Sequence, residues 1–352
     1  MERSSGADEA SLVRLRLDDP RWTKFALAHP DALPYHHPAW AMLLAECYGY
    51  RAFALAGRGA EARIVAGLPL VEARGLLGGR RWVSLPFTDH CPPLAPSETE
   101  RRALATAANR ARAEAGVAQL EIHAAVESAG ARPGPAAVTH TLALAGDPDA
   151  VRRTFSRSQV QRNIRKAKAA DLVLRRGETR RDLTHVFYDL HLRTRRRLGV
   201  PVQPRRFFDR FWKRIVEPGL GFISLVSKDD KAIAGAVFLT WNGTVTYKYG
   251  ASEPSSWQHR PNHLIFSDAI EWSCLHGFHT FDFGRSDLED DGLRAFKGGW
   301  GTKEEPLEYT LFADGQPRAS SGKAAQIVRP LIRRSPLWVS RGLGELLYKY
   351  AA

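Results

Sequence analysis

The stretch from Phe281 to Trp300 gathers the residue types that acyl transfer requires. A strand-like segment ends at Gly284, and Arg285, Asp287 and Lys297 follow on glycine-flanked backbone that we expect to form a loop. Loops at strand ends in open α/β sheets commonly bind ligands. Acyl transfer to an amine needs a neutral nucleophile, a group that takes its proton, and donors for the developing oxyanion. The stretch therefore predicts an acyl-transfer site; the alternative is a solvated loop that its aromatic residues only anchor.

Each charged residue of this stretch has a predicted role. Lys297 supplies positive charge at the oxyanion or at a donor phosphate, and the alternative is a surface lysine. Asp287 or Asp282 accepts the proton of the nucleophile. Because Asp282 lies on the strand between two phenylalanines, its side chain faces away from theirs. It could equally orient Arg285 or cap a turn.

A second group of candidate residues surrounds the predicted start of a helix at Pro261. Asn262 and His263 lie in the first turn of this helix. His263 could bind substrate or serve as a base, although most histidines in such positions are satisfied structural groups. Arg260 and the helix start together could hold one phosphate.

The elements that must position these residues are helices and a three-stranded antiparallel meander. Asn242-Gly243 is the dipeptide most favoured for a tight type I′ hairpin. A helix from Pro261 to about His276 and a strand over Thr280–Phe283, parallel to its neighbour, follow the meander. The other expected helices cover about 149–170, 181–198 and 207–215, and the other expected strands cover 172–175, 222–227, 232–241, 244–250 and 306–312.

The first half of the chain repeats this order more weakly, which internal duplication explains economically. With the boundary near residues 146–149, we expect domains over 1–148 and 149–318 and a basic amphipathic tail over 319–352. Expected elements are helices over 38–47 and 97–115, strands over 52–56, 63–72, 82–85 and 117–122, and a loop over 129–137.

Composition limits the setting of these domains. A chain of 352 residues is longer than one hydrophobic core usually supports, so we expect two domains. Three scattered cysteines favour neither a disulfide framework nor a zinc ribbon, so a reducing cytoplasm is expected. We expect no signal peptide, because the N-terminus lacks an apolar core, and no membrane-spanning segment, because no apolar run approaches roughly 20 residues.

Positive charge is concentrated in the second half. The net charge is +13, and residues 151–352 hold the excess, most densely over Arg152–Arg214. Such a face attracts polyanions such as tRNA, phosphorylated lipid intermediates or an anionic membrane, unless the arginines only keep helices soluble. The tail over 319–352 mixes arginines with apolar residues, which suits either an interfacial helix on anionic lipid or packing against the domain.

The order of helices, meander, helix and parallel strand resembles the GNAT acyltransferase fold. This resemblance implies an α/β (α+β) protein with two tandem GNAT-like domains, each a mixed, mostly antiparallel sheet flanked by helices. Single-domain GNAT enzymes that use acetyl-CoA place a glycine-rich turn before the next helix, because its N–H groups must reach the pyrophosphate. Residues 253–262 of this chain contain no glycine. Standard acetyl-CoA use is therefore less expected, and it stays open.

Seven short stretches carry a closer resemblance through their order and spacing, since no single one is specific. They are Pro38-Ala39-Trp40 with Tyr48-Gly49, Gly67-Leu68-Pro69-Leu70, 84–91, 161–167, 261–264, 281–286 and 296–301. Together they resemble the FemAB-like transferases, a doubled-GNAT family. It includes enzymes that add amino acids to peptidoglycan precursors and relatives from exopolysaccharide gene clusters.

The resemblance implies transfer of an aminoacyl group from aminoacyl-tRNA to an amine of a cell-envelope intermediate, or acylation of a sugar in the exopolysaccharide branch. By match, Lys297 is the lysine of the family's Phe-Lys-x-x-(Phe/Trp)-Gly motif, near the donor phosphate and the reacting carbonyl, and Phe296 and Trp300 share that motif. Arg165 comes with the stretch 161–167. Asp89 is expected to contact the acceptor in a cleft between the domains. The chain lacks the coiled-coil insertion of peptidoglycan-specific members, which argues against lipid-linked peptidoglycan as acceptor.

The sequence thus predicts an acyl- or aminoacyltransferase acting on an amine or hydroxyl of an envelope or exopolysaccharide precursor. Acyl-CoA or aminoacyl-tRNA is its co-substrate, no cofactor is tightly bound, and the protein works in the cytoplasm or at the inner membrane. We expect no metal, because His36-His37 and His90-Cys91 fit no zinc spacing. The alternative is a non-catalytic RNA- or membrane-surface-binding module on a decayed transferase fold.

Overall fold

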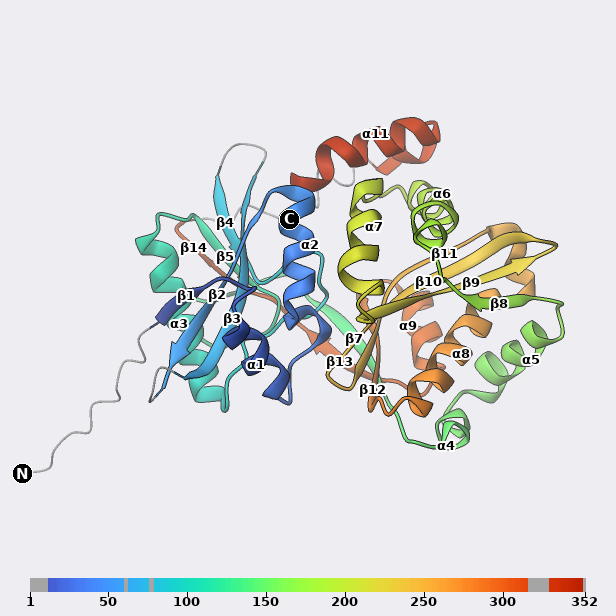
Figure 1. Cartoon of the computed structure of the whole chain (residues 1–352), viewed down its shortest axis with the longest axis horizontal. Helices are drawn as coiled ribbons and strands as arrows, with labels where there is room; N and C mark the ends of the chain where they lie inside the picture. The colour runs from blue at the N-terminus through green and yellow to red at the C-terminus, as the bar shows by residue number, and fades with distance from the viewer. Residues whose placement is uncertain (1–11, 60–62, 76–78, 316–328, 351–352) are drawn as a thin grey trace, which may run out of the picture. The chain divides into compact units, whose positions relative to one another are not determined.

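The computed structural model describes residues 12–59, 63–75, 79–315 and 329–350. The chain divides into two compact units, one of Met1–Ala45, Tyr50–Gly134 and Tyr309–Pro317, the other of Glu46–Gly49, Pro135–Glu308 and Arg318–Ala352. Each unit contains a mixed seven-stranded sheet with helices packed on it (Figure 1). The expected fold class of two sheets flanked by helices is confirmed.

The first unit is built on a sheet in the order β1-β2-β3-β4-β5-β14-β6. Strands β1 to β4 are antiparallel, and β4 pairs with β5 in parallel across the crossover helix α3. Ser97 caps α3 by accepting a hydrogen bond from the backbone N–H of Glu100. The elements are β1 Leu12–Leu15, α1 Pro20–Ala28, η1 Pro34–His36, α2 Pro38–Tyr48, β2 Arg51–Arg58, β3 Ile64–Arg74, β4 Arg80–Val83, α3 Glu98–Glu114, β5 Gln119–Ile122, β6 Arg132–Pro133 and β14 Thr310–Ala313.

The second unit is built on a sheet in the order β13-β7-β12-β11-β10-β9-β8. Its centre is the predicted meander of β9, β10 and β11, and β12 joins β11 in parallel as predicted. The strands are β7 Ala137–Ala143, β8 Val173–Arg176, β9 Gly221–Lys228, β10 Lys231–Trp241, β11 Thr244–Ser252, β12 Thr280–Ser286 and β13 Lys303–Leu307. The helices are α4 Pro148–Arg153, η3 Arg157–Gln161, α5 Arg162–Lys168, η4 Asp182–Phe187, α6 Tyr188–Leu198, α7 Arg205–Phe211, η5 Trp212–Val216, η6 Pro254–His259, α8 Pro261–Leu275, α9 Asp291–Gly298 and α11 Leu337–Leu347.

The hairpin at Asn242-Gly243 has the predicted backbone. Both residues have positive φ, 48° and 74°, as a type I′ turn requires. The β9–β10 turn shows the same pattern at Asp229 and Asp230, with φ of 48° and 57°. Two tight turns with matching twist therefore fix the register of the meander.

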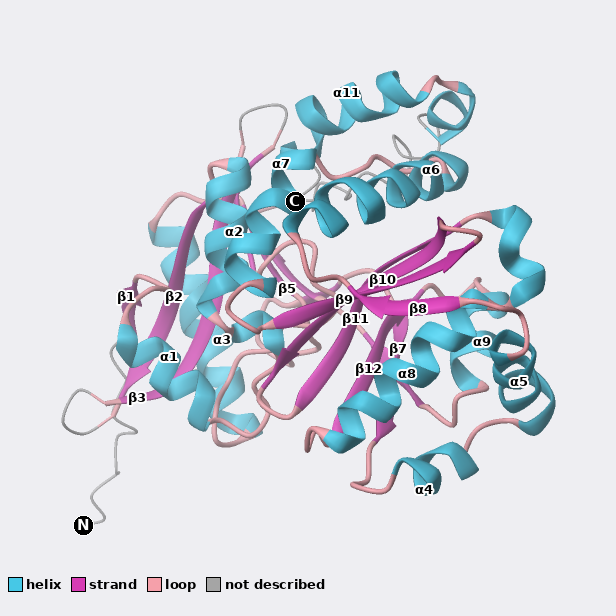
Figure 2. Ribbon diagram, turned by 45° about the vertical axis from the view of Figure 1, so that its right-hand side comes forward, coloured by secondary structure: helices cyan, strands magenta, loops and turns pink. Residues whose placement is uncertain are grey.

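Alternate side chains of the meander pack on opposite faces of the second sheet. Ala236 and Phe238 of β10 belong to the core cluster that includes α8, whereas Tyr249 of β11 packs against His191 of α6 and Phe208 of α7. Figures 1 and 2 show α8 on one side of the sheet and α6 and α7 on the other. This period of two lets one sheet pack against α8 on one face and against α6 and α7 on the other.

Two expected elements in the second half were wrong in extent. The single strand expected over 306–312 is two strands, because β13 pairs with β7 while β14 pairs with β5 and β6. The single helix expected over 149–170 is interrupted after α4, where the side chain of Ser156 accepts from the backbone N–H of Gln159 and begins η3.

The compact units differ from the expected domain ranges 1–148 and 149–318. Strand β7, which precedes residue 149, lies in the second sheet between β12 and β13. Strand β14 returns to the first sheet from the end of the second range. Each sheet is completed by backbone pairing with a strand distant in sequence, and local patterns do not reveal such pairing.

The described part of the tail packs on the second unit. Residues 329–334 are helical and α11 follows. Glu345 accepts from the backbone N–H of Arg205 and from the guanidinium of Arg206, and Ile332 and Tyr348 are buried. Residues 319–328, including the join at Ser320-Ser321-Gly322, lie outside the described residues. In the described part of the chain, no helix combines the length and the apolar character needed to cross a bilayer.

Candidate functional site

Strands β11 and β12 pair for three residues and then separate. Their parallel register joins Thr244 to Thr280 and ends at Thr246 and Asp282. Beyond this pair, residues 247–252 and 283–286, all within the described chain, continue without pairing to each other. The backbone groups along the opening are therefore available to a ligand, as at an exposed sheet edge.

Asp282 sits at the vertex of this opening and holds the local backbone. One carboxylate oxygen accepts from the backbone N–H of Gly284 at 2.7 Å, and the other lies 3.5 Å from the Thr246 hydroxyl. Gly284 has φ of 71°, and the register of β12 with β7 shifts there. Of the predicted alternatives for Asp282, the structure shows the turn cap, at a bulge that redirects β12.

Lys297 reaches back from α9 to the same bulge. Its side chain is buried, with a relative exposure of 3% for the residue. The ammonium donates to the carbonyl oxygens of Gly284 and Arg285, each at 2.8 Å. The alternative of a surface lysine is therefore wrong, because this lysine carries a buried positive charge 2.8 Å from the backbone of β12.

The backbone expected to be a loop is regular at two of its three charged residues. Arg285 lies on β12, and Lys297 lies in the last turn of α9, which begins where the side chain of Asp290 accepts from the N–H of Leu293. Arg285 and Asp287 form an ion pair at 3.0 Å, with the carboxylate side 65% exposed. Asp287 lies in an exposed turn between β12 and α9, so a solvated loop is present there, whereas the alternative is wrong for Arg285 and Lys297.

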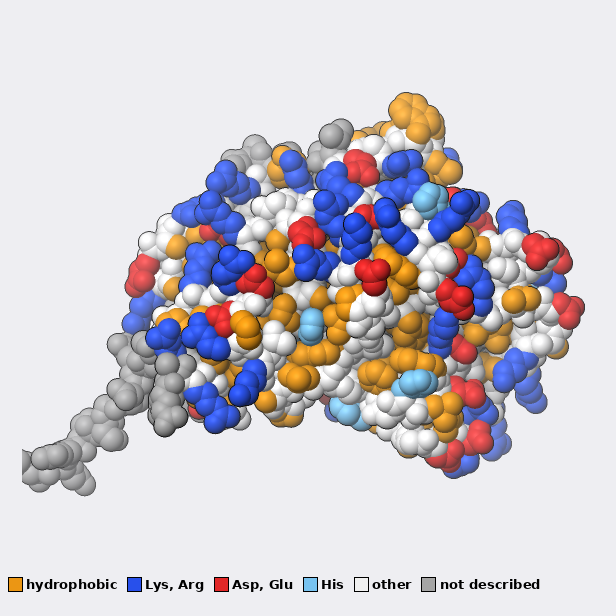
Figure 3. Space-filling model, viewed as in Figure 1, with side chains coloured by type: hydrophobic (Ala, Val, Ile, Leu, Met, Phe, Trp, Pro, Cys, Tyr) orange, Lys and Arg blue, Asp and Glu red, His pale blue; other side chains and the backbone are white. Residues whose placement is uncertain are grey.

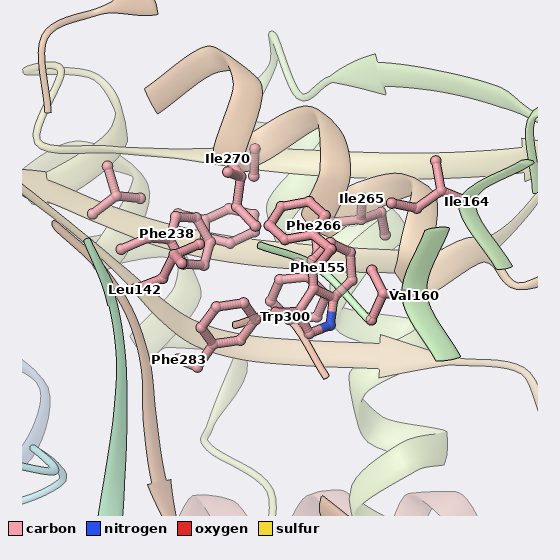
Figure 4. Packing of buried hydrophobic residues seen from close by; sticks show 14 of the residues in the cluster. Leu142, Phe155, Val160, Ile164, Phe238, Ile265, Phe266, Ile270, Phe283 and Trp300 are labelled. Atoms are coloured by element: carbon pink, nitrogen blue, oxygen red, sulfur yellow. The ribbon is translucent and has the colours of Figure 1, made fainter. Parts of the chain in front are cut away.

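Aromatic residues join the start of α8 to the end of α9. The ring of His263 lies edge-on to Phe296 at 5.4 Å and 5.8 Å from Trp300. Figure 4 shows Trp300 between Phe155, Phe266 and Phe283, within the core cluster. Its indole nitrogen is buried and has no hydrogen-bond partner in the described chain.

His263 is neutral at ordinary pH. Burial lowers its pKa to about 4, the charge of Arg260 acts in the same direction, and a hydrogen bond with the backbone of Gln159 opposes them. Its Nε2 lies 3.5 Å from the amide nitrogen of Asn163. The predicted start of α8 thus contacts the stretch 161–167, one of the seven that carry the family resemblance.

A cavity of about 230 Å³ adjoins the opened strand. Its β11 lining runs from Tyr247 to Ser252, the part of the strand that no longer pairs with β12. Asn262 of α8 also lines it, as predicted for a substrate-binding residue, and Arg197 of α6 lies at its rim. Arg260 precedes α8 in a left-handed conformation, φ 60°, with its Nε buried and unpartnered among the described residues.

Two predicted residues, Arg165 and Asp89, make none of the contacts described above. Arg165 is exposed in the last turn of α5. Asp89 belongs to the first unit, where its backbone carbonyl accepts from the hydroxyl of Tyr309 at 3.0 Å. In the described ranges, no three histidine, cysteine or acidic side chains are grouped to hold a metal ion. The roles of Arg165 and Asp89 as substrate contacts remain predictions.

The sequence did not single out His140. It lies on β7 in a fully buried position, and burial together with the charge of Lys297 lowers its pKa to about 4. Its Nε2 is 3.6 Å from a carboxylate oxygen of Glu304. His140 lies beside Lys297 only because β7, a strand that we did not expect, joins the second sheet. In the sequence it is a histidine between two threonines, a pattern that does not indicate a functional site.

Comparison with known proteins gives matches to transferases. Residues 154–297 match the family described as Acetyltransferase (GNAT) domain. The Lipid II:glycine glycyltransferase of Staphylococcus epidermidis (strain ATCC 35984) is 30% identical over 121 residues, which are 32% of this chain and 28% of the relative. That of Staphylococcus aureus is 31% identical over 120 residues, 29% and 28% of the two chains. This chain thus spans less than a third of the length of these relatives.

Solved structures share the whole fold. FemX superposes with a TM-score of 0.70 at 16% identity, over 90% of this chain and 100% of FemX. A tandem GNAT protein from the clavulanic acid biosynthesis pathway gives a TM-score of 0.52 at 14% identity, over 88% and 99%. At these identities the likeness shows the fold alone. It confirms that two GNAT-like units follow each other in one chain.

Proposed function

We propose that the chain is a FemAB-like acyltransferase and that it moves an acyl or aminoacyl group to an amine or hydroxyl of a cell-envelope precursor. The match of residues 154–297 to the GNAT acetyltransferase domain and the partial match to glycyltransferases support this proposal. The donor is acyl-CoA or aminoacyl-tRNA. The partial relatives named above are glycyltransferases for Lipid II, and a cell-wall precursor is the corresponding acceptor class here. More specifically, we propose that the acceptor is an exopolysaccharide precursor.

The separation of β11 from β12 carries the proposal. An acyl group on an extended carrier can enter between the strands and hydrogen bond to the groups that the sheet leaves open. The adjoining cavity is lined by Gly235, Ala236, Gly250 and Ala251, so backbone lies close to its surface. This arrangement suits a narrow chain better than a bulky rigid ligand.

The reaction has three steps at this vertex. The neutral nucleophile attacks the carbonyl carbon of the donor, and the carbonyl oxygen becomes an oxyanion. The oxyanion returns its electron pair, the bond to the donor's oxygen or sulfur breaks, and the leaving group takes a proton. The proton that the nucleophile loses passes to a nearby base.

We assign the fixed positive charge near the oxyanion to Lys297. Its ammonium is held by two carbonyls, so no reorganisation is needed when charge develops. Asp282 positions the vertex, and it or Asp287 accepts the proton. Neutral His263 is a further acceptor, and Phe296, Trp300 and Arg285 shape the surroundings.

We also propose contact with an anionic membrane, where a lipid-linked precursor is found. Trp338 and Leu331 of the tail are 76% and 65% exposed. Arg329, Arg333 and Arg334 lie within the same segments and are exposed. Exposed aromatic and aliphatic side chains beside arginines suit an interfacial position on the cytoplasmic face.

Incubation of the protein with charged tRNA and, separately, with an acyl-CoA panel tests the proposal. Each mixture contains a cytoplasmic envelope-precursor fraction, and mass spectrometry follows the acceptor. A mass gain equal to the acyl group, dependent on protein and on one donor, supports it. Intact donors and unchanged acceptors in every mixture, with binding of tRNA retained, would instead favour a non-catalytic RNA-binding module.

A further inference from the structure

Four arginines gather in a second cavity beside the first. This cavity, of about 370 Å³, is lined by Arg193, Arg196 and Arg197 of α6, by Arg333 of the tail, and by residues 252–254. Figure 3 shows Lys and Arg side chains gathered over the region of α6 and α7. Arg195, from the same run, instead donates to the carbonyl of Pro201, so the fold selects part of the run for this cavity.

The charges in this cavity do not balance. One carboxylate, Glu253, faces four guanidinium groups and pairs with Arg193 at 3.0 Å. The Nε of Arg196 is buried and finds no hydrogen-bond partner among the described residues. Grouped like charges repel, and an unpartnered buried donor costs free energy. A ligand with two or more negative charges removes both penalties.

The two cavities share Arg197 and Ser252. One guanidinium nitrogen of Arg197 donates to the carbonyl of Ser252 at 3.4 Å. A ligand whose charged end lies among the arginines can therefore extend past these two residues, along β11 and toward the opened strands.

An exposed aromatic ring borders the same point. The guanidinium of Arg197 lies 4.8 Å from the ring of Trp257, whose indole N–H donates to the hydroxyl of Ser252 at 2.9 Å. Trp257 is 46% exposed. An indole held in place beside arginines is a surface on which a nucleobase stacks.

We infer that Arg193, Arg196, Arg197 and Arg333 bind the phosphates of the acyl donor's nucleotide end, with its base on Trp257 and its acyl arm in the smaller cavity. This inference rests on the proposed function and deepens it. The arginines then take the role that a glycine-rich turn would have in 253–262. The pyrophosphate of CoA and the 3′-terminal phosphates of a tRNA share this chemistry.

Binding measurements on the full chain test the site. The probes are CoA, inorganic pyrophosphate and an acceptor-stem RNA minihelix, each titrated by calorimetry at two salt concentrations. The double variant R196Q/R197Q and the single variant R333Q are compared with R153Q. Arg153 lines neither cavity and its side chain is 72% exposed, so R153Q removes one charge from the same unit.

We expect the double variant to raise the Kd of CoA or of the minihelix about tenfold, R333Q to raise it several-fold, and R153Q to leave it unchanged. The probe that loses affinity identifies the donor. The inference is overturned if no probe binds the wild-type chain, if both variants bind within twofold of wild type, or if R153Q loses as much. R333Q alters an exposed side chain, so it decides the matter even if the double variant fails to fold.

The site and the proposed function can fail separately. If the arginine variants lose nucleotide affinity but the wild type transfers no acyl group, the binding site is supported and the proposed function is contradicted. If the wild type transfers an acyl group and these variants do so equally well, the proposed function is supported and the binding site is contradicted.

Discussion

The ammonium of Lys297 lies 2.8 Å from the carbonyl oxygen of Gly284, thirteen residues earlier in the chain. Gly284 in turn donates its N–H to Asp282. A cation and an anion are thereby attached to the two sides of one glycine, at the point where β11 and β12 separate. The structural contacts of Lys297 and the catalytic role that we propose for it therefore have to be tested together.

Replacement of Lys297 by Met tests this relationship. The variant leaves two buried carbonyls without their donor, so we expect a loss of about 2 kcal/mol in the free energy of unfolding. We also expect acyl transfer to fall by at least a hundredfold at temperatures where the variant is folded. Thermal melts and initial rates measure the two effects.

Lys303→Met is the matched control, because the Lys303 side chain is 74% exposed. It should change neither quantity. Transfer by the Lys297 variant within a few-fold of wild type would remove the assigned charge from the mechanism.

Two substitutions of Asp282 separate its cap from its charge. Asp282→Asn keeps an oxygen that can accept from Gly284, so stability should change by less than about 0.5 kcal/mol, whereas Asp282→Ala should lose about 1 kcal/mol or more. If Asp282 accepts the proton, both variants lose activity. Denaturant unfolding and initial rates distinguish the cases, and full activity of Asp282→Asn would assign the proton to another group.

Narrowing the smaller cavity at Gly250 should impair donor binding. A Cβ added to Gly250 would lie 1.8 Å from the hydroxyl oxygen of Tyr247, so the tyrosine must move. We expect Gly250→Ala to raise the KM for the donor, and the added change Tyr247→Phe to restore part of the loss. A donor KM of Gly250→Ala equal to that of the wild type would indicate that the donor does not pass this point.

Stability should fall as the pH drops from about 6.5 toward 4. Burial, as the largest cause, lowers the pKa of His36, His140 and His263 to about 4 and that of His191 to about 3. The unfolded chain binds protons on these imidazoles near pH 6.5, while the folded chain stays neutral, so acid favours unfolding. Each group contributes a slope of at most about 1.4 kcal/mol per pH unit.

Chemical unfolding at several pH values measures this slope. His191→Gln should reduce it by the share of one proton, while His276→Gln, at an exposed position, should not. A flat profile between pH 7 and pH 5 contradicts the expectation.

The exposed apolar residues of the tail should contribute to membrane binding. We expect Trp338→Ala with Leu331→Ala to weaken binding to phosphatidylglycerol vesicles by roughly tenfold, because both side chains leave water on insertion. Leu275→Ala, at a residue that is also 65% exposed, is the control. Vesicle sedimentation gives the affinities, and equal binding by all three proteins would remove the tail from the membrane contact.

Local patterns were sufficient where neighbours in sequence are neighbours in space. Asn242-Gly243 dictated its own turn, and Pro261 marked the start of α8. The same reasoning missed β7 and merged β13 with β14. The partners that stabilise these strands lie far away in the chain.

The sequence by itself determined the tandem α/β plan, the meander and the residue types available for acyl transfer, since periodicity, turn chemistry and composition are local properties. Only the tertiary structure decided that Lys297 is buried against β12, that His140 stands beside it, and that Arg333 joins three arginines of α6. Burial and electrostatic neighbourhood depend on which distant segments pack together, and no spacing along the chain contains that information.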